Sequence, residues 1–175
     1  MKIRESKGFT LIELLIVVAI IGIIAAIAIP GLLRARMSGN EASAIGSLRA
    51  INSGQAAYSS SCGNGGYATS LGDLFTAPTG GTGFISPDLK ANGTVKSGYT
   101  VTLAAASGAQ AVSASTATCN GTASQSAYYA SAAPQTLNGT GTRAFATDTR
   151  GTIFQVVNNA TPPGNPIPST ATPVQ

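Results

Sequence analysis

The chain has 175 residues, of which 43% are hydrophobic and only 9% are charged, with a formal net charge of +4. This length accommodates one domain with a hydrophobic core and is too short for two comfortable ones. The few Lys and Arg residues are spread thinly, whereas a nucleic-acid-binding surface clusters them against phosphates. We therefore expect no specific nucleic-acid site.

Catalytic constellations are also missing from the sequence. The chain has no histidine, and its carboxylates are dispersed. It contains no Gly-rich phosphate loop, nucleophile elbow or metal-ligand cluster. We expect a protein that is not an enzyme and that needs neither a cofactor nor a metal.

Residues 9–33 form an almost wholly apolar run. At about 1.5 Å per residue, a helix of about 25 residues reaches about 37 Å, which exceeds the ~30 Å thickness of the hydrocarbon layer. Lys2, Arg4 and Lys7 precede the run and place the N-terminus on the cytoplasmic side. The sequence thus predicts a single-pass membrane helix with the rest of the chain outside.

Two ordinary interpretations of this segment leave something unexplained. A secretory signal could be cleaved near Ala26–Ala28, which has the small-x-small pattern, but the apolar run continues past that point. A plain signal-anchor accounts for the length and the orientation of the run. Neither interpretation explains why a carboxylate, Glu13, stands inside it.

A third interpretation uses the short charged leader, Gly8 and the sequence Phe9-Thr10-Leu11-Ile12-Glu13 together. This arrangement resembles the processing site of type IV pilins and of their relatives, the type II secretion pseudopilins. The resemblance implies that a prepilin peptidase cleaves after Gly8 and methylates the new N-terminal residue, Phe9. Residues 1–8 would then be a removed leader, and residues 9–33 would stay on the mature protein.

Glu13 gains a rationale from such cleavage. It would lie one helical turn, about 6 Å, from the new terminus. There the positive end of the helix dipole and the free amine of Phe9 would both favour its charged form. The resemblance implies that Glu13 pairs with the N-terminal amine of a neighbouring subunit during assembly, while pairing with its own amine is an alternative that can coexist with this.

Residues that weaken a helix interrupt the long helical pattern. Pro30 removes a backbone donor and clashes with the preceding turn, and Gly31 follows it, so we expect a kink there. Gly22 is a second weak point. The resemblance implies that the stretch between Gly22 and Pro30 can lose helical order in a filament.

Beyond Pro30 the pattern becomes amphipathic. Met37, Ala44, Ile51 and Tyr58 recur every seven residues and predict an apolar face that covers the protein's own sheet, with a coiled-coil partner as the alternative. The residues expected on the opposite, polar face are Arg36, Asn40, Ser43, Ser47, Arg49 and Asn52.

The second half of the chain favours a small antiparallel sheet. Strand patterns occupy residues 97–106, 126–133, 142–148 and 151–157, and the last two suggest a hairpin. A short helix is possible at Ser70–Phe75. We expect an α+β fold in which a long N-terminal helix, membrane-spanning in its first half and amphipathic in its second, packs on a sheet of about four strands. The resemblance implies the same pilin fold.

Two further features complete the expected organisation. Cys62 and Cys119 lack metal or redox spacing, and an extracytoplasmic destination favours a disulfide over two separate buried thiols. Residues 161–175 hold five prolines and no charge, which predicts a flexible tail. The expected parts are thus a leader (1–8), a membrane or filament-core helix (9–33), a globular domain (34–160) and the tail (161–175).

The resemblance implies a structural subunit of a type IV pilus. Such a subunit is held in the inner (cytoplasmic) membrane and then polymerised through its N-terminal helix into an extracellular filament for adhesion, motility or DNA uptake. Its implied partners are other copies of itself, the prepilin peptidase, the inner-membrane assembly machinery and, before assembly, the lipid bilayer. The alternatives are a minor pilin, a secretion pseudopilin and a monomeric membrane-anchored binding module. Because no Trp and no acidic cluster accompany the C-terminal strands, a pilin is favoured over a calcium-binding major pseudopilin.

Overall fold

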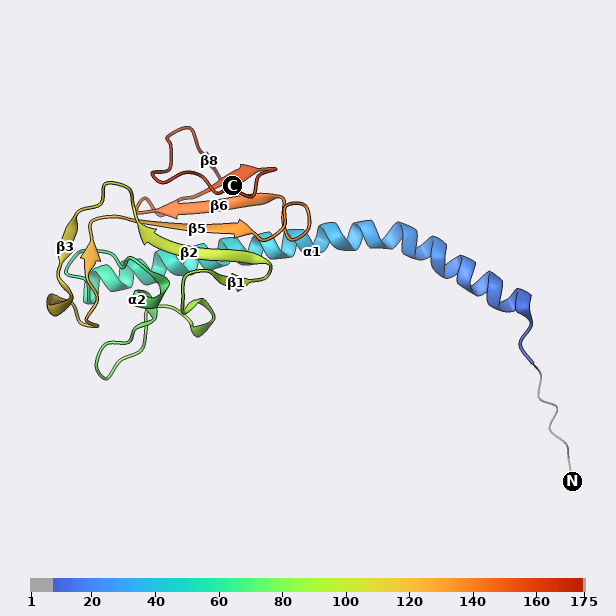
Figure 1. The fold of residues 1–175 in the computed structure, drawn as a ribbon, viewed down its shortest axis with the longest axis horizontal. Coiled ribbons are helices and arrows are strands. Elements are labelled where there is room, and N and C mark those ends of the chain that lie inside the picture. Colours follow the sequence, from blue (N-terminus) through green and yellow to red (C-terminus); the bar gives the residue numbers. More distant parts are fainter. Residues whose placement is uncertain (1–7, 175) are drawn as a thin grey trace, which may run out of the picture. The chain divides into compact units, whose positions relative to one another are not determined.

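A computed structural model describes residues 8–174, in two units of residues 8–36 and 37–174. One helix, α1 (Leu11–Ser61), runs through both units (Figure 1). The predicted leader lies outside the described residues, apart from Gly8 at its end.

The first unit consists mainly of the apolar half of α1. All of its large apolar side chains from Phe9 to Leu33 are exposed. This helix is long and apolar enough to cross a membrane, with a mean hydropathy of 3.1 over its most apolar window. An α-helix suits that setting because its backbone groups bond to one another within the segment. Helical order continues through Gly22, Pro30 and Gly31 in the single chain, so a kink and a loss of order in a filament stay predictions.

The second unit is built on a six-stranded antiparallel sheet in the order β1-β2-β5-β6-β7-β8. Its strands are β1 (Thr94–Lys96), β2 (Tyr99–Ala105), β5 (Tyr128–Pro134), β6 (Arg143–Asp148), β7 (Ile153–Val157) and β8 (Thr172–Pro173). A separate pair is formed by β3 (Ala111–Ser113) and β4 (Ser124–Gln125).

The α+β class is confirmed, but the expected number of about four strands is too low. The four predicted segments are β2, β5, β6 and β7, which are neighbours at the centre of the sheet. The missed strands have only two or three residues each, too few to show an alternating pattern. The predicted hairpin is confirmed: β6 pairs with β7, and the turn closes with Gly151 N–H donating to the carbonyl of Asp148 at 2.8 Å.

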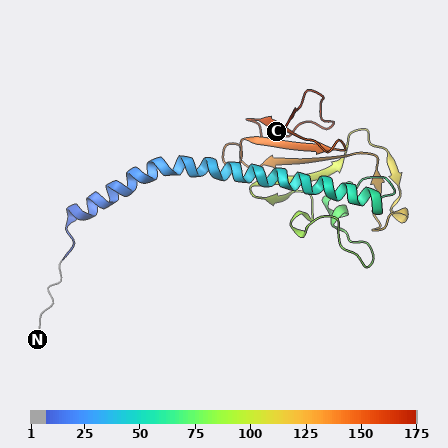
Figure 2. The ribbon, with the colours of Figure 1, turned by 180° about the vertical axis from the view of Figure 1, so that it is seen from behind.

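The amphipathic half of α1 covers one face of this sheet, as Figure 2 shows with the helix in front of the strands. Ala44, Leu48, Ile51 and Tyr58 are buried in the main core, which confirms the predicted apolar face. The expectation for the polar residues needs correction, because several of them also face the sheet.

Asn52 illustrates this correction. Its side-chain amide donates to Thr147 Oγ1 at 3.1 Å and to the carbonyl of Gly151 at 2.9 Å, and its oxygen accepts a bond from the Tyr128 hydroxyl at 3.0 Å. Asn52 is half-buried, whereas Ser47 is buried and its hydroxyl donates to the carbonyl of Ser43 at 3.0 Å. Polar side chains can be buried at a helix–sheet contact where hydrogen bonds replace water, and the heptad pattern does not show which ones find partners.

Shorter elements connect the helix to the sheet. The predicted short helix is present as α2 (Leu71–Phe75), with Ser70 Oγ accepting from the N–H of Asp73 as its cap. Two 3-10 turns, η1 (Pro87–Leu89) and η2 (Ser115–Ala117), follow. The predicted disulfide is confirmed: Cys62, just after α1, is bonded to Cys119, just after η2.

The C-terminal segment differs from the flexible tail predicted for it. We call residues 161–174 the C-terminal strap. Its strand β8 pairs with β7, and Ile167 is buried against Ala146 and Phe154. Figure 1 shows it in dark red on the side of the sheet away from β1. Its prolines favour an extended chain, and such a chain orders where an apolar surface and hydrogen-bond partners receive it.

Candidate assembly site at the N-terminal helix

The start of α1 is a capping box formed by Thr10 and Glu13. The backbone N–H of Thr10 donates to Glu13 Oε2 at 2.9 Å, and the N–H of Glu13 donates to Thr10 Oγ1 at 3.3 Å. The Thr10 hydroxyl also donates to Glu13 Oε2, at 2.7 Å. These reciprocal bonds satisfy donors that the first turn of a helix cannot satisfy within itself. Glu13 therefore has a defined partner inside its own chain.

The predicted processing residues lie just before this cap. Gly8 and Phe9 precede the helix and are exposed, Phe9 with 84% of its surface accessible. Before any cleavage, the nitrogen of Phe9 is a peptide nitrogen, so no free amine stands beside Glu13. The structure thus shows how the carboxylate is held in the uncleaved chain, while both predicted amine partners stay predictions.

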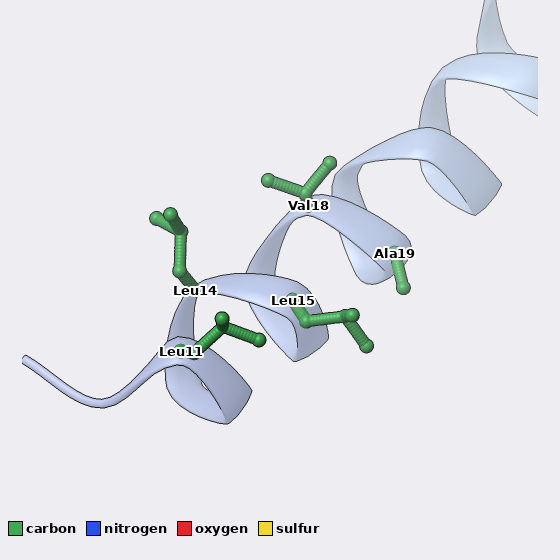
Figure 3. A pocket seen from close by; sticks show the side chains of 5 residues that line it. All are labelled: Leu11, Leu14, Leu15, Val18 and Ala19. Atoms are coloured by element: carbon green, nitrogen blue, oxygen red, sulfur yellow. The ribbon is translucent and has the colours of Figure 1, made fainter.

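The first turns of α1 also present a continuous apolar face. Leu11, Leu14, Leu15, Val18 and Ala19 line this surface (Figure 3). Their spacing of three and four residues places them along one side of the helix. All five come from one helix, and the large ones are exposed, so the face is free in the single chain. It suits packing against another helix or against lipid.

One member of this site was missed from the sequence. Thr10 was noticed only as part of the processing motif, although Thr-x-x-Glu directly before an apolar run is the usual sequence signature of a capping box. Recognising it would have given Glu13 a local partner in addition to the amines considered.

A second missed residue, Glu41, lies at the helix–sheet contact of the globular unit. This carboxylate is buried and accepts bonds from Thr142 N–H at 2.7 Å and from the Thr142 hydroxyl at 2.8 Å. Arg143 Nε donates to its other oxygen at 2.8 Å, and an Arg143 terminal nitrogen lies 2.7 Å from the same oxygen. Arg143 also donates to Gln155 Oε1 at 2.8 Å.

The surroundings of Glu41 favour its ionised form. Burial alone raises the pKa of this carboxyl, but the hydrogen bonds from Thr142 and the bonds and positive charge of Arg143 outweigh it, so that the pKa lies below its ordinary value of 4.5. Every oxygen contact of Glu41 is thus made by a group of the fold itself. These bonds hold α1 against the sheet. Both oxygens of the Glu41 carboxylate are already used in them, which indicates a structural role.

Metal ligands were not expected from the sequence, and among residues 8–174 no group of three His, Cys, Asp or Glu side chains is placed to hold an ion. The globular unit therefore gives no geometric support for a metal centre within its described residues. The features that indicate a function lie in the N-terminal segment.

Comparison with known proteins identifies that segment. Residues 3–29 match the family described as the prokaryotic N-terminal methylation motif. The N-terminal segment is similar to that of type IV pilins. The chain is 66% identical over 38 residues to the type IV wide pilus major component PilA4 of Thermus thermophilus, which is 22% of this chain and 29% of that protein.

Two further relatives are similar to this chain over a short segment as well. The type IV major pilin protein PilA of Myxococcus xanthus is 46% identical over 54 residues, 31% of this chain and 24% of the relative. A fimbrial protein of Pseudomonas aeruginosa is 82% identical over 27 residues, 15% of this chain and 18% of the relative. The matches thus span less than a third of each relative's length, and no solved structure matches the chain significantly. They confirm the predicted resemblance to type IV pilins.

Proposed function

We propose that the chain is a structural subunit of a type IV pilus, held in the membrane by α1 and polymerised through that helix into an extracellular filament. The observation that carries the proposal is the methylation motif over residues 3–29, followed by an apolar helix with all its large side chains exposed. The curated relatives are named as pilus, pilin and fimbrial proteins, and none of these names denotes an enzyme.

Processing precedes assembly in this proposal. A prepilin peptidase cleaves between Gly8 and Phe9 and methylates the new amine on Phe9. The capping box holds the carboxylate of Glu13 at the start of the helix, where a neighbouring subunit's amine can reach it. In a helix bundle with a low dielectric constant, this pairing attracts at short range and fixes the register, which apolar faces alone do not.

Exposed glycines in the second half of α1 support close packing between copies. Gly39 and Gly46 have open space where a side chain would stand, so no contact in the subunit requires glycine there. Each costs the helix about 0.5–1 kcal/mol relative to alanine. The remaining exposed positions of this stretch are mostly small: Ser38, Ala42, Ala50, Ser53, Ala56, Ala57 and Ser60. Small residues let helix backbones approach closely. In a filament, these exposed positions of α1 would allow helices of neighbouring copies to pack closely.

The proposed location follows from the same helix. The precursor spans the inner membrane once with its N-terminus in the cytoplasm, and the globular unit lies outside, where Cys62 and Cys119 can oxidise. The inner-membrane assembly machinery then extracts the subunit into the filament.

Mild shearing of cells tests the proposal. We expect the chain in the sheared, filamentous fraction, and mass spectrometry should find a mature N-terminus at methylated Phe9. A chain that stays with the membrane would instead indicate an anchored monomeric module. A terminus at Ile29 would indicate secretory cleavage and would contradict the proposal.

Substitutions at Gly46 test the packing role of the helix. Gly46→Ala should raise the free energy of unfolding of the subunit by about 0.5–1 kcal/mol and leave filaments intact. Gly46→Leu should leave the subunit folded but reduce filament yield at least fivefold, as measured by shearing, because a large side chain separates the helices. Thr116→Leu, at an exposed position of η2, serves as the control with normal filaments. Normal filaments from Gly46→Leu would contradict close packing at this position.

A further inference from the structure

The outer face of the sheet, opposite α1, carries a second apolar cluster. Side chains alternate along each strand, so Phe145 faces the main core while Ala146 faces outward, and Ile153 and Phe154 divide in the same way. The outward cluster is formed by Ala146, Phe154, Ile167, Tyr129 and Ala171. Two of these, Ile167 and Ala171, belong to the C-terminal strap. The strap therefore completes an apolar cluster that the sheet begins.

Polar groups of the sheet hold the backbone of the strap. The hydroxyl of Tyr129 donates to the carbonyl of Pro163 at 2.5 Å, and Arg150 donates to the carbonyl of Ile167 at 3.3 Å. Arg150 is itself positioned by Asp148, at 2.7 Å, and stacks on the ring of Phe154 at 4.6 Å. The site thus combines an aromatic surface with donors aimed at peptide carbonyls.

The strap is held at two further places, by the side chain of Asn165 and by backbone pairing near Val174. Asn165 accepts a bond from Ser107 N–H at 2.8 Å and donates to the carbonyl of Ala105 at 3.2 Å. Near the end of the strap, Val174 N–H donates to the carbonyl of Ile153 at 2.8 Å, next to the β7–β8 pairing. The Asn165 contacts depend on its side chain, whereas the contacts of Val174 and β8 are made by the backbone.

The ligand class follows from the strap itself. Residues 161–174 contain no charged side chain and five of the chain's nine prolines fall in 161–175. Proline-rich segments are already extended and lose little entropy on docking against aromatic rings and carbonyl-directed donors. Ile167, with 6% of its surface exposed, is the buried anchor. The site is therefore matched to an uncharged, proline-rich peptide with one aliphatic anchor.

The attachment of the strap allows exchange. It is joined to β7 by residues 158–160, all exposed, and Asn158 has a positive φ of 53° at the bend. β8 contributes only two residues of pairing. Segments with few buried contacts open locally at much lower free energy than the whole fold, and an identical element can be exchanged between copies through such a joint.

We propose that the outer face around Tyr129, Arg150 and Phe154 is a peptide-binding site that its own strap fills in the single chain and that the strap of a second copy can fill in its place. This inference is independent of filament formation through α1. It assigns residues 161–174 a second role as a link between subunits.

The test uses the full-length chain in detergent micelles and a fluorescent synthetic peptide with the sequence of residues 161–174. The variant Ile167→Asp weakens the binding of the chain's own strap to the outer face, because it replaces the buried anchor with a charge. We therefore expect the peptide to bind this variant at least tenfold more tightly than it binds the unchanged chain. A control peptide carrying the same Ile-to-Asp change should bind at least tenfold more weakly than the normal peptide. Adding Arg150→Ala to Ile167→Asp should weaken binding of the normal peptide.

A milder variant is used in case Ile167→Asp does not fold. Asn165→Ala removes the two bonds to Ser107 and Ala105 and leaves the apolar anchor in place. We expect peptide binding between that of the unchanged chain and that of Ile167→Asp, with unchanged near-ultraviolet circular dichroism. Equal binding of the normal and control peptides, or no gain over the unchanged chain in either folded variant, would overturn the proposal.

Discussion

Glu13→Gln is expected to abolish filaments or to reduce their yield at least tenfold, while membrane insertion stays intact or improves. Glutamine can still accept from the N–H of Thr10, so the capping box is retained and only the negative charge is lost. If the charge draws an incoming subunit to the amine of its neighbour, this substitution removes the attraction without disturbing the helix. Filament yield after shearing and chain content of the membrane fraction are the two measurements.

Thr10→Val is the matched control for Glu13→Gln. It removes the hydroxyl that bonds to Glu13 and keeps the carboxylate. The start of the helix should fray slightly, since loss of a cap costs about 1 kcal/mol of helix stability, and filaments should persist. Normal filaments from Glu13→Gln would refute an assembly role for the charge. Loss of filaments in Thr10→Val, with Glu13→Gln unaffected, would assign the effect to the cap.

The second large effect is expected at the buried carboxylate of Glu41. Glu41→Ala should lower the free energy of unfolding by about 1–3 kcal/mol, because it leaves the half-buried Arg143 and the N–H of Thr142 without their partner. Asp88→Ala is the control, since the pair of Asp88 with Lys96 is largely exposed and its loss should cost less than about 1 kcal/mol. Urea denaturation, monitored by the circular dichroism of the tyrosines, measures the free energy of unfolding of both variants. Equal costs in the two variants would contradict the role assigned to Glu41.

The same carboxylate predicts how stability depends on pH. The pKa of Glu41 is lower in the fold than its ordinary value of 4.5, so the folded chain binds fewer protons than the unfolded chain. Its contribution is therefore complete above about pH 4.5 and is lost as the pH falls through the folded pKa. Glu41→Gln should flatten the decrease of stability between pH 5 and pH 3, and an unchanged slope would show that other carboxylates dominate it.

Local chemistry made much of this protein predictable. The charged leader, Gly8 and Glu13 all lie within the first 13 residues, so their arrangement follows from their spacing in the sequence. The apolar run and the heptad from Met37 to Tyr58 likewise predict helix and buried face, because helical geometry fixes which neighbours share a side. The four central strands are predictable from local pattern too, because each is long enough to show alternation of apolar and polar residues.

Contacts between distant segments decided the rest. Glu41 and Arg143 are 102 positions apart, and nothing near either residue indicates that antiparallel pairing of β6 with its neighbours brings Arg143 under the helix. The strap has the composition of a flexible tail, yet it is ordered because the outer face of β6 and β7 supplies Phe154 and Arg150 to receive it. The sequence by itself determined the apolar helix and the place of Glu13 near its start, because those depend on neighbours within a few residues. Only the tertiary structure decided which polar groups are buried with partners and where the C-terminus lies, because these depend on surfaces that exist only once the sheet has formed.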